Sequence, residues 1–143
     1  MFNGCIEVRW GESLLALSFY NKTNMRMSPY IFSGLGSAAY ALIKADGQER
    51  SLDSLSARYI LLEQKPHGIQ AINTFLLREH HNSTTEEAYH FAMDCFRKHR
   101  GKLTPEVKSK LLTVMEQIME ADNRISPREI NFMEKFKDDL EKF

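Results

Sequence analysis

Apolar residues recur through much of the chain at three- and four-residue spacing, the period of an amphipathic helix. The clearest stripe follows Thr104-Pro105, a typical helix start, and contains Val107, Leu111, Val114, Met115 and Ile118. Another lies near the end of the sequence, where one helical face would carry Ile130, Met133, Phe136, Leu140 and Phe143. We expect two helices here, each with one buried face.

Helix start and stop signals predict further helices upstream. Ser28-Pro29 offers an N-cap followed by proline at the first helical position, and this helix is expected to run to about Ala45, before Gly47. Residues 51–81 contain enough apolar positions for two more helices, with a break near the Pro-His-Gly sequence at residues 66–68.

Two capping boxes mark further helix starts, because Ser or Thr is followed three residues later by Glu. In the first, Thr84 pairs with Glu87, and the helix that follows is expected to end at Gly101. In the second, Ser126 pairs with Glu129 at the start of the last helix.

Residues 1–27 are harder to interpret than the rest. Residues 13–20 are compatible with a first helix, whereas residues 5–10 alternate like a strand that has no partner elsewhere. We therefore predict an all-α, single-domain bundle of about six to seven helices. It consists of an N-terminal segment, residues 1–27, which is partly helical, and a helical domain over residues 28–143.

One internal similarity stands out. Residues 42–47 and residues 118–123 each end an apolar helix with Ala-Asp, followed by Gly47 or Asn123. Glycine and asparagine best tolerate the left-handed conformation that closes many helices. A new helix then begins at a serine in both copies. The sequence thus predicts two pseudo-repeated helix–acidic turn–helix units and a pseudo-symmetric bundle.

The acids at these turns are candidate metal ligands. Asp46 and Asp122 lie at helix C-termini, where the helix dipole disfavours a carboxylate unless a hydrogen bond, a basic neighbour or a cation compensates. Seven residues later come Asp53 and Glu129, and a helix–turn–helix would fold each pair of acids together. Such oxygens suit a divalent cation such as Ca²⁺, Mg²⁺ or Mn²⁺. The alternative is that the acids are only helix caps and turn residues.

The motif Ala-Asp-Asn-Arg-Ile-Ser-Pro-Arg-Glu at residues 121–129 resembles the signature of TerB-like, tellurite-resistance domains. The upstream Ser-Pro and Ala-Asp-Gly elements fit the first repeat of that family, and the resemblance covers residues 28–140. It implies an all-α fold with an acidic, metal-chelating surface, a bacterial stress-response setting and no established enzymatic activity. The chain departs from the pattern at Asn123, where glycine is usual, at Glu49, where an apolar residue is usual, and at the offset Asp53.

Charge and cysteine content narrow the choice of function. Lys plus Arg and Asp plus Glu number 19 each, so no overall field attracts nucleic acid or an anionic membrane. Residues 30–43 are apolar but too short to span a bilayer. Cys5 and Cys95 form no paired motif, which is consistent with a reducing cytoplasm.

Other candidate sites have simpler explanations. His90 and Asp94 are one helical turn apart, but their apolar neighbours favour packing over chelation. We expect a non-enzymatic module that binds a divalent metal, a protein partner, or both, through the acidic turns. A plain helical protein-interaction scaffold is the alternative. A hydrolase using the paired carboxylates ranks last.

Overall fold

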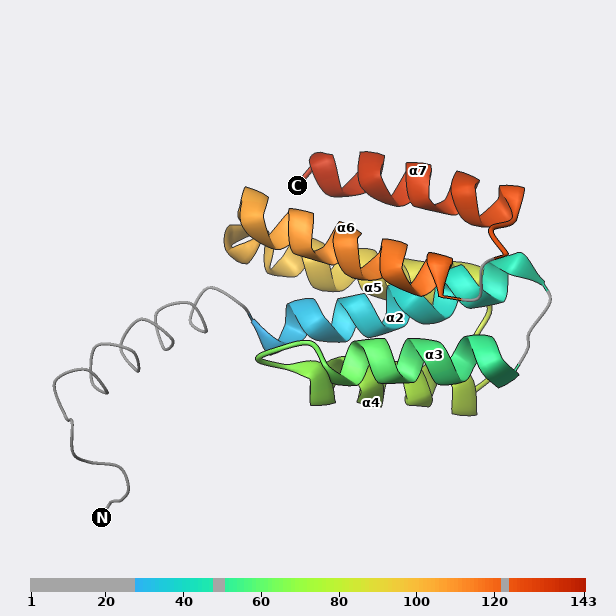
Figure 1. The fold of residues 1–143 in the computed structure, drawn as a ribbon. Helices are drawn as coiled ribbons and strands as arrows, with labels where there is room; N and C mark the ends of the chain where they lie inside the picture. Colours follow the sequence, from blue (N-terminus) through green and yellow to red (C-terminus); the bar gives the residue numbers. More distant parts are fainter. Residues whose placement is uncertain (1–27, 48–50, 122–123) are drawn as a thin grey trace, which may run out of the picture.

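The computed structural model describes residues 28–47, 51–121 and 124–143, and these residues form an all-α bundle without strands (Figure 1). Six α helices and one 3₁₀ turn follow in order: α2 (Pro29–Asp46), α3 (Ser51–Leu62), α4 (Gly68–His80), α5 (Thr85–Lys98), η1 (Arg100–Lys102), α6 (Pro105–Glu120) and α7 (Pro127–Glu141). The prediction of an all-α bundle is confirmed. The predicted helix at residues 13–20 lies outside the described residues.

The predicted helix starts are confirmed by their capping hydrogen bonds. The Ser28 hydroxyl accepts from the Tyr30 N–H before α2, and the Thr104 hydroxyl accepts from the Val107 N–H before α6. Both capping boxes, before α5 and before α7, are formed. Gly47 closes α2 in the left-handed conformation, with φ of 74°. These local signals place helix ends because each satisfies a backbone group that the helix leaves unpaired.

Two detailed predictions are wrong. Helix α5 ends at Lys98 rather than at Gly101, because the chain turns at His99 into η1. Ile130 does not face the core, since its side chain is 46% exposed, and Phe132 is buried in the same helix instead. Met133, Phe136 and Leu140 of the predicted stripe are buried, so the prediction for α7 is wrong only in its first turn.

Helix α2 lies at the centre of the bundle, with α3 and α4 below it in Figure 1 and α5, α6 and α7 above it. Small residues let its neighbours approach closely. A Cβ on Gly36 would lie 2.0 Å from the carbonyl oxygen of Ala71 in α4. On the α5 side, the buried Ser37 hydroxyl donates to the Ala88 carbonyl at 2.7 Å. The unbroken apolar character of α2 thus reflects burial on nearly all sides.

Aromatic side chains attach α7 to the rest of the bundle. Phe136 is fully buried, and its ring centroid lies 6.1 Å from that of Phe96 in α5. Phe132 meets Tyr89 edge to face at 5.4 Å. Such pairs add directional preference to the free energy gained from apolar burial.

The helices on either side of each predicted acidic turn are present, but residues 48–50 and 122–123 within the turns lie outside the described residues, and the two helix pairs occupy different places. Helix α2 is central, whereas α6 contacts α2, α3 and α7 at the periphery. The pseudo-symmetric bundle stays a prediction. Among the described helices, none has an apolar stretch long enough to cross a bilayer.

Candidate functional site

The four predicted metal ligands are only partly placed by the structure. Asp46 is the last residue of α2 and is half-buried, and Glu129 is buried in the first turn of α7. Asp53 belongs to the first turn of α3, but its side chain is outside the described part, and Asp122 lies outside the described residues.

Glu129 caps its own helix. One of its carboxylate oxygens accepts a hydrogen bond from the Ser126 N–H at 3.0 Å, and the Glu129 N–H donates to the Ser126 hydroxyl at 3.1 Å. Its side chain is only 7% exposed. The carboxylate thus satisfies a backbone donor and also complements the positive end of the α7 dipole. This arrangement agrees with the alternative in which the acids are helix caps.

The end of α2 nevertheless lies near the start of α7, at the same end of the bundle (Figure 1). A Cβ on Gly47 would lie 2.9 Å from a guanidinium nitrogen of Arg128. Arg128 therefore brings positive charge to the C-terminus of α2, where the helix dipole is negative, a contribution of about 0.3–1 kcal/mol. A basic group thus lies one residue from Asp46, at the helix end where the sequence predicted that a carboxylate needs compensation.

Among the described side chains, which exclude those of Asp53 and Asp122, no three His, Cys, Asp or Glu residues are grouped so that they could hold a metal ion. His90 and Asp94, for which the sequence favoured packing over chelation, are not buried and form a contact of 3.4 Å between a ring nitrogen and a carboxylate oxygen. The same carboxylate also accepts from Arg97 at 2.6 Å. These two residues form a surface ion-pair cluster.

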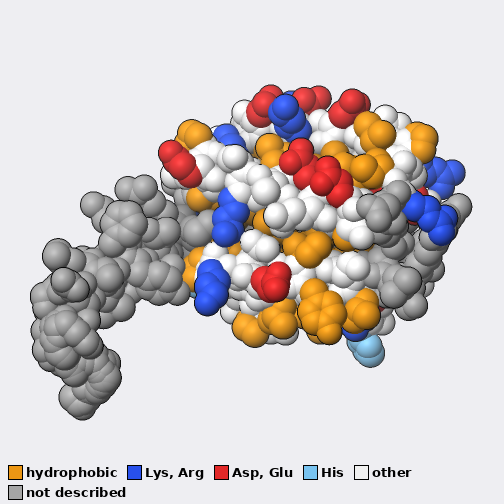
Figure 2. Space-filling view, in the orientation of Figure 1, with side chains coloured by type: hydrophobic (Ala, Val, Ile, Leu, Met, Phe, Trp, Pro, Cys, Tyr) orange, Lys and Arg blue, Asp and Glu red, His pale blue; other side chains and the backbone are white. Residues whose placement is uncertain are grey.

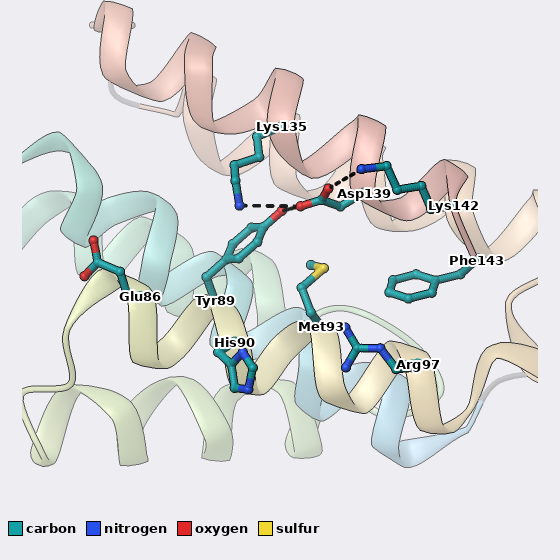
Figure 3. A pocket seen from close by; sticks show the side chains of 9 residues that line it. All are labelled: Glu86, Tyr89, His90, Met93, Arg97, Lys135, Asp139, Lys142 and Phe143. Atoms are coloured by element: carbon teal, nitrogen blue, oxygen red, sulfur yellow. Dashed lines mark hydrogen bonds and ion pairs between the residues drawn. The ribbon is translucent and has the colours of Figure 1, made fainter.

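A groove of about 490 Å³ lies between α5 and α7 (Figure 3). Asp139 is central to it and accepts a hydrogen bond from the Tyr89 hydroxyl. Lys135 and Lys142 each place their ammonium nitrogen 3.5 Å from an oxygen of the same carboxylate. Tyr89 joins α5 to the C-terminal half of α7 through this hydrogen bond and through Lys135, whose ammonium nitrogen lies 4.0 Å from the centroid of its ring.

The charges in this groove stabilise one another. Burial alone would raise the pKa of Asp139, but the Tyr89 hydrogen bond and the two lysines outweigh it and hold that pKa below its ordinary range. Burial, together with the hydrogen bond to Asp139 and its negative charge, raises the pKa of Tyr89 far above its ordinary value. Tyr89 is thus neutral and Asp139 ionised at neutral pH, so the hydroxyl can donate to the carboxylate and hold α5 and α7 together.

An exposed apolar face lies on the α3–α4 pair. On α3 the residues at i, i+4 and i+7 are Leu55, Tyr59 and Leu62, and their side chains are 46%, 63% and 46% exposed. Figure 2 shows hydrophobic side chains in a row along this edge of the molecule. Helix α4 adds Ile69, Leu76 and Leu77 to the exposed apolar residues. We call Leu55, Tyr59, Leu62, Ile69, Leu76 and Leu77 the α3–α4 face.

Polar contacts hold these two helices together. Arg58 in α3 forms an ion pair with Glu79 in α4, with 2.5 Å between nitrogen and oxygen. The other oxygen of Glu79 accepts from the Ser54 hydroxyl at 2.6 Å. The α3–α4 face is therefore presented by helices whose relative position is fixed by side-chain contacts.

Pattern reading of the sequence missed this face. Helix α3 carries two apolar stripes. One contains Ala57 and Leu61 and is buried, whereas the other contains Leu55, Tyr59 and Leu62 and is exposed. The sequence feature that could have revealed the face is the number of apolar residues in α3, which is larger than one buried helix face requires. Only the packing of α3 against α2, α4 and α6 shows which stripe points outward.

Comparison with known proteins adds no functional assignment. No family model, curated protein or solved structure matches this chain, so the TerB-like resemblance rests on the motifs of the sequence alone.

Proposed function

We propose that this chain is a non-enzymatic, helical protein-binding module whose α3–α4 face receives an amphipathic helix of a protein partner. The observation that carries the proposal is the exposed i, i+4, i+7 stripe formed by Leu55, Tyr59 and Leu62. Exposed apolar patches with this order mark interaction sites more often than scattered apolar residues do.

The composition of the face suits this role. Tyrosine provides a large apolar ring with a polar tip and is enriched at binding hot spots. Tyr59 is the most exposed residue of the stripe and stands between two leucines on the same helix face. An amphipathic partner helix would offer its own apolar residues at the same spacing, as in other helix-in-groove interactions.

The acidic turns support the proposal indirectly, because they have a structural task. Glu129 is engaged in its capping box, and Arg128 lies against the turn that follows Asp46. Under this proposal the acids stabilise the ends of α2 and α7. Binding then depends on the apolar face at another side of the bundle.

Tyr59→Asp is expected to abolish capture of the partner without unfolding the protein. The substitution places a charge at the centre of the contact, where burying it unpaired costs several kcal/mol, whereas in the free protein this side chain is largely exposed. The measurement is quantitative affinity capture from extracts of the source cells, with chemical cross-links mapped by mass spectrometry.

Ile130→Asp is the matched control, because Ile130 is as exposed as Leu55 but lies on α7. It should leave capture unchanged. A partner retained equally by Tyr59→Asp, or cross-linked away from α3 and α4, would contradict the proposed role of this face.

Binding of a divalent cation at the acidic turns is the second candidate function. It is favoured by one observation, the closeness of the two turns at the Gly47–Arg128 contact. Asp46, Asp53, Asp122 and Glu129 are the proposed ligands, and Ca²⁺, Mg²⁺ or Mn²⁺ the proposed ion. Within the described residues, Glu129 would have to leave its capping box or share an oxygen with the ion.

If this second candidate holds, millimolar Ca²⁺, Mg²⁺ or Mn²⁺ should raise the unfolding free energy by about 1 kcal/mol, because even weak binding to the folded state adds stability. Thermal unfolding with and without each ion measures the effect. Asp122→Asn should remove the increment, whereas Asp138→Asn, at an exposed acid in α7, should not. An unfolding midpoint insensitive to all three ions would exclude the site.

The cellular setting is proposed from the resemblance to TerB-like domains and from cysteine usage. These support a role in a bacterial stress response in the cytoplasm. Sensitivity of a deletion strain to tellurite, with rescue by the intact sequence, would test this part separately from partner binding.

A further inference from the structure

We propose that residues 10–20 of this chain occupy the α3–α4 face when no partner is bound, so that the module covers its own binding surface. This inference rests on the proposed function, because it names the segment that covers the same face when no partner is bound. Three features support it: the chain enters α2 near the face, the N-terminal segment is long enough to reach it, and the segment has apolar residues at the spacing of the face.

The chain enters α2 close to one end of the face. The Phe32 ring, in the first turn of α2, meets the His67 ring edge to face with 5.5 Å between centroids. His67 belongs to the connection between Leu62, which ends α3, and Ile69, in the first turn of α4. Both Leu62 and Ile69 are exposed members of the face. The N-terminal segment is therefore tethered beside its proposed docking surface.

The tether is long enough to reach it. Residues 21–27 can span up to about 25 Å when extended. The stripe from Leu55 to Leu62 is about 10 Å long on a helix that rises 1.5 Å per residue. On a helix, the positions from Trp10 to Leu17 would likewise span about 10 Å, which matches the length of the stripe. Tethering also raises the effective concentration of the segment, so modest contacts suffice.

The segment has the chemistry that the face requires. Glu12 is its single charged side chain, and residues 13–21 contain none. Trp10, Leu14 and Leu17 repeat the i, i+4, i+7 spacing of the stripe on α3. Two apolar stripes of equal spacing can interdigitate, and their contact removes both from water at about 25 cal/mol per Å² of apolar area. The face and the segment thus complement one another within a single chain.

Trp10 is the single tryptophan of the sequence, so its fluorescence reports directly on the segment. In the dilute full-length protein we expect blue-shifted emission and weak quenching by acrylamide. Leu55→Asp and Tyr59→Asp should each shift the emission toward that of the denatured chain and raise the quenching constant several-fold. Leu14→Asp, in the segment itself, should do the same. Ile130→Asp should retain the wild-type spectrum.

Three results would overturn the inference. The first is a solvent-exposed Trp10 in the wild-type protein, or a buried Trp10 that ignores both face substitutions. The second is a blue shift that disappears on dilution together with a doubled mass in light scattering, because the occupant is then a second copy. The third is a blue shift that appears only after phosphatidylcholine vesicles are added, because the segment then binds a membrane.

The outcomes for this inference and for the proposed function are separable. If capture of the partner depends on Tyr59 but Trp10 is exposed to solvent, the proposed binding function holds and the proposal that residues 10–20 cover the face is wrong. If Trp10 is buried by contacts with Leu55 and Tyr59 but no partner requires Tyr59, residues 10–20 cover the face and the proposed binding function is wrong.

Discussion

Gly36→Ala should lower the free energy of unfolding by about 3 kcal/mol or more, at the upper end of what overpacking costs. The added methyl group would lie 2.0 Å from the Ala71 carbonyl oxygen and 2.9 Å from its carbonyl carbon. Backbone atoms of a packed helix cannot move aside as the tip of a side chain can, so α2 and α4 must separate. The gain in helix propensity, about 1 kcal/mol for Gly to Ala, offsets only part of this loss.

Urea denaturation followed by circular dichroism measures this effect. Gly101→Ala is the control, because no atom lies within 4 Å of a Cβ at that position. It should change the unfolding free energy by no more than about 0.5 kcal/mol. Equal midpoints for the two variants would show that α2 and α4 are not packed as closely as the structure has them.

Phe136→Ala should destabilise the protein by about 3–5 kcal/mol, because it removes a fully buried ring and leaves a cavity. The ring packs against Phe96 at 6.1 Å and stacks on Phe132 at 6.4 Å between centroids. Its loss removes one of two aromatic contacts described between α5 and α7. We expect hydrogen exchange to accelerate most in α7, whose remaining attachment to α5 includes the Tyr89–Asp139 hydrogen bond.

Phe91→Ala makes the same chemical change at a partly exposed position of α5. Its cost should be clearly smaller, since a side chain already in contact with water leaves little cavity. Phe136→Leu should recover part of the lost stability because it refills most of the volume. If all three variants unfolded at the same urea concentration, the position of α7 against α5 would be in error.

The candidate site was predictable only in part. The capping box of Ser126 and Glu129 could be read from spacing, because it depends on atoms within one turn of the chain. The proximity of Gly47 and Arg128 depends on how α2 and α7 pack, and the motif at residues 121–129 gave no role to Arg128. The sequence pattern likewise placed Ile130 in the core, whereas the bundle buries Phe132.

The sequence by itself determined the helical class, the helix starts and the left-handed end of α2 at Gly47, because each follows from local hydrogen bonding and backbone freedom. Tertiary structure alone decided that α2 is central, that Gly36 meets the α4 backbone and that one of two apolar stripes on α3 faces outward. Periodicity shows that a helix has an apolar face, but which faces are buried depends on partners distant in the sequence. The α3–α4 face is therefore a property of the packed bundle.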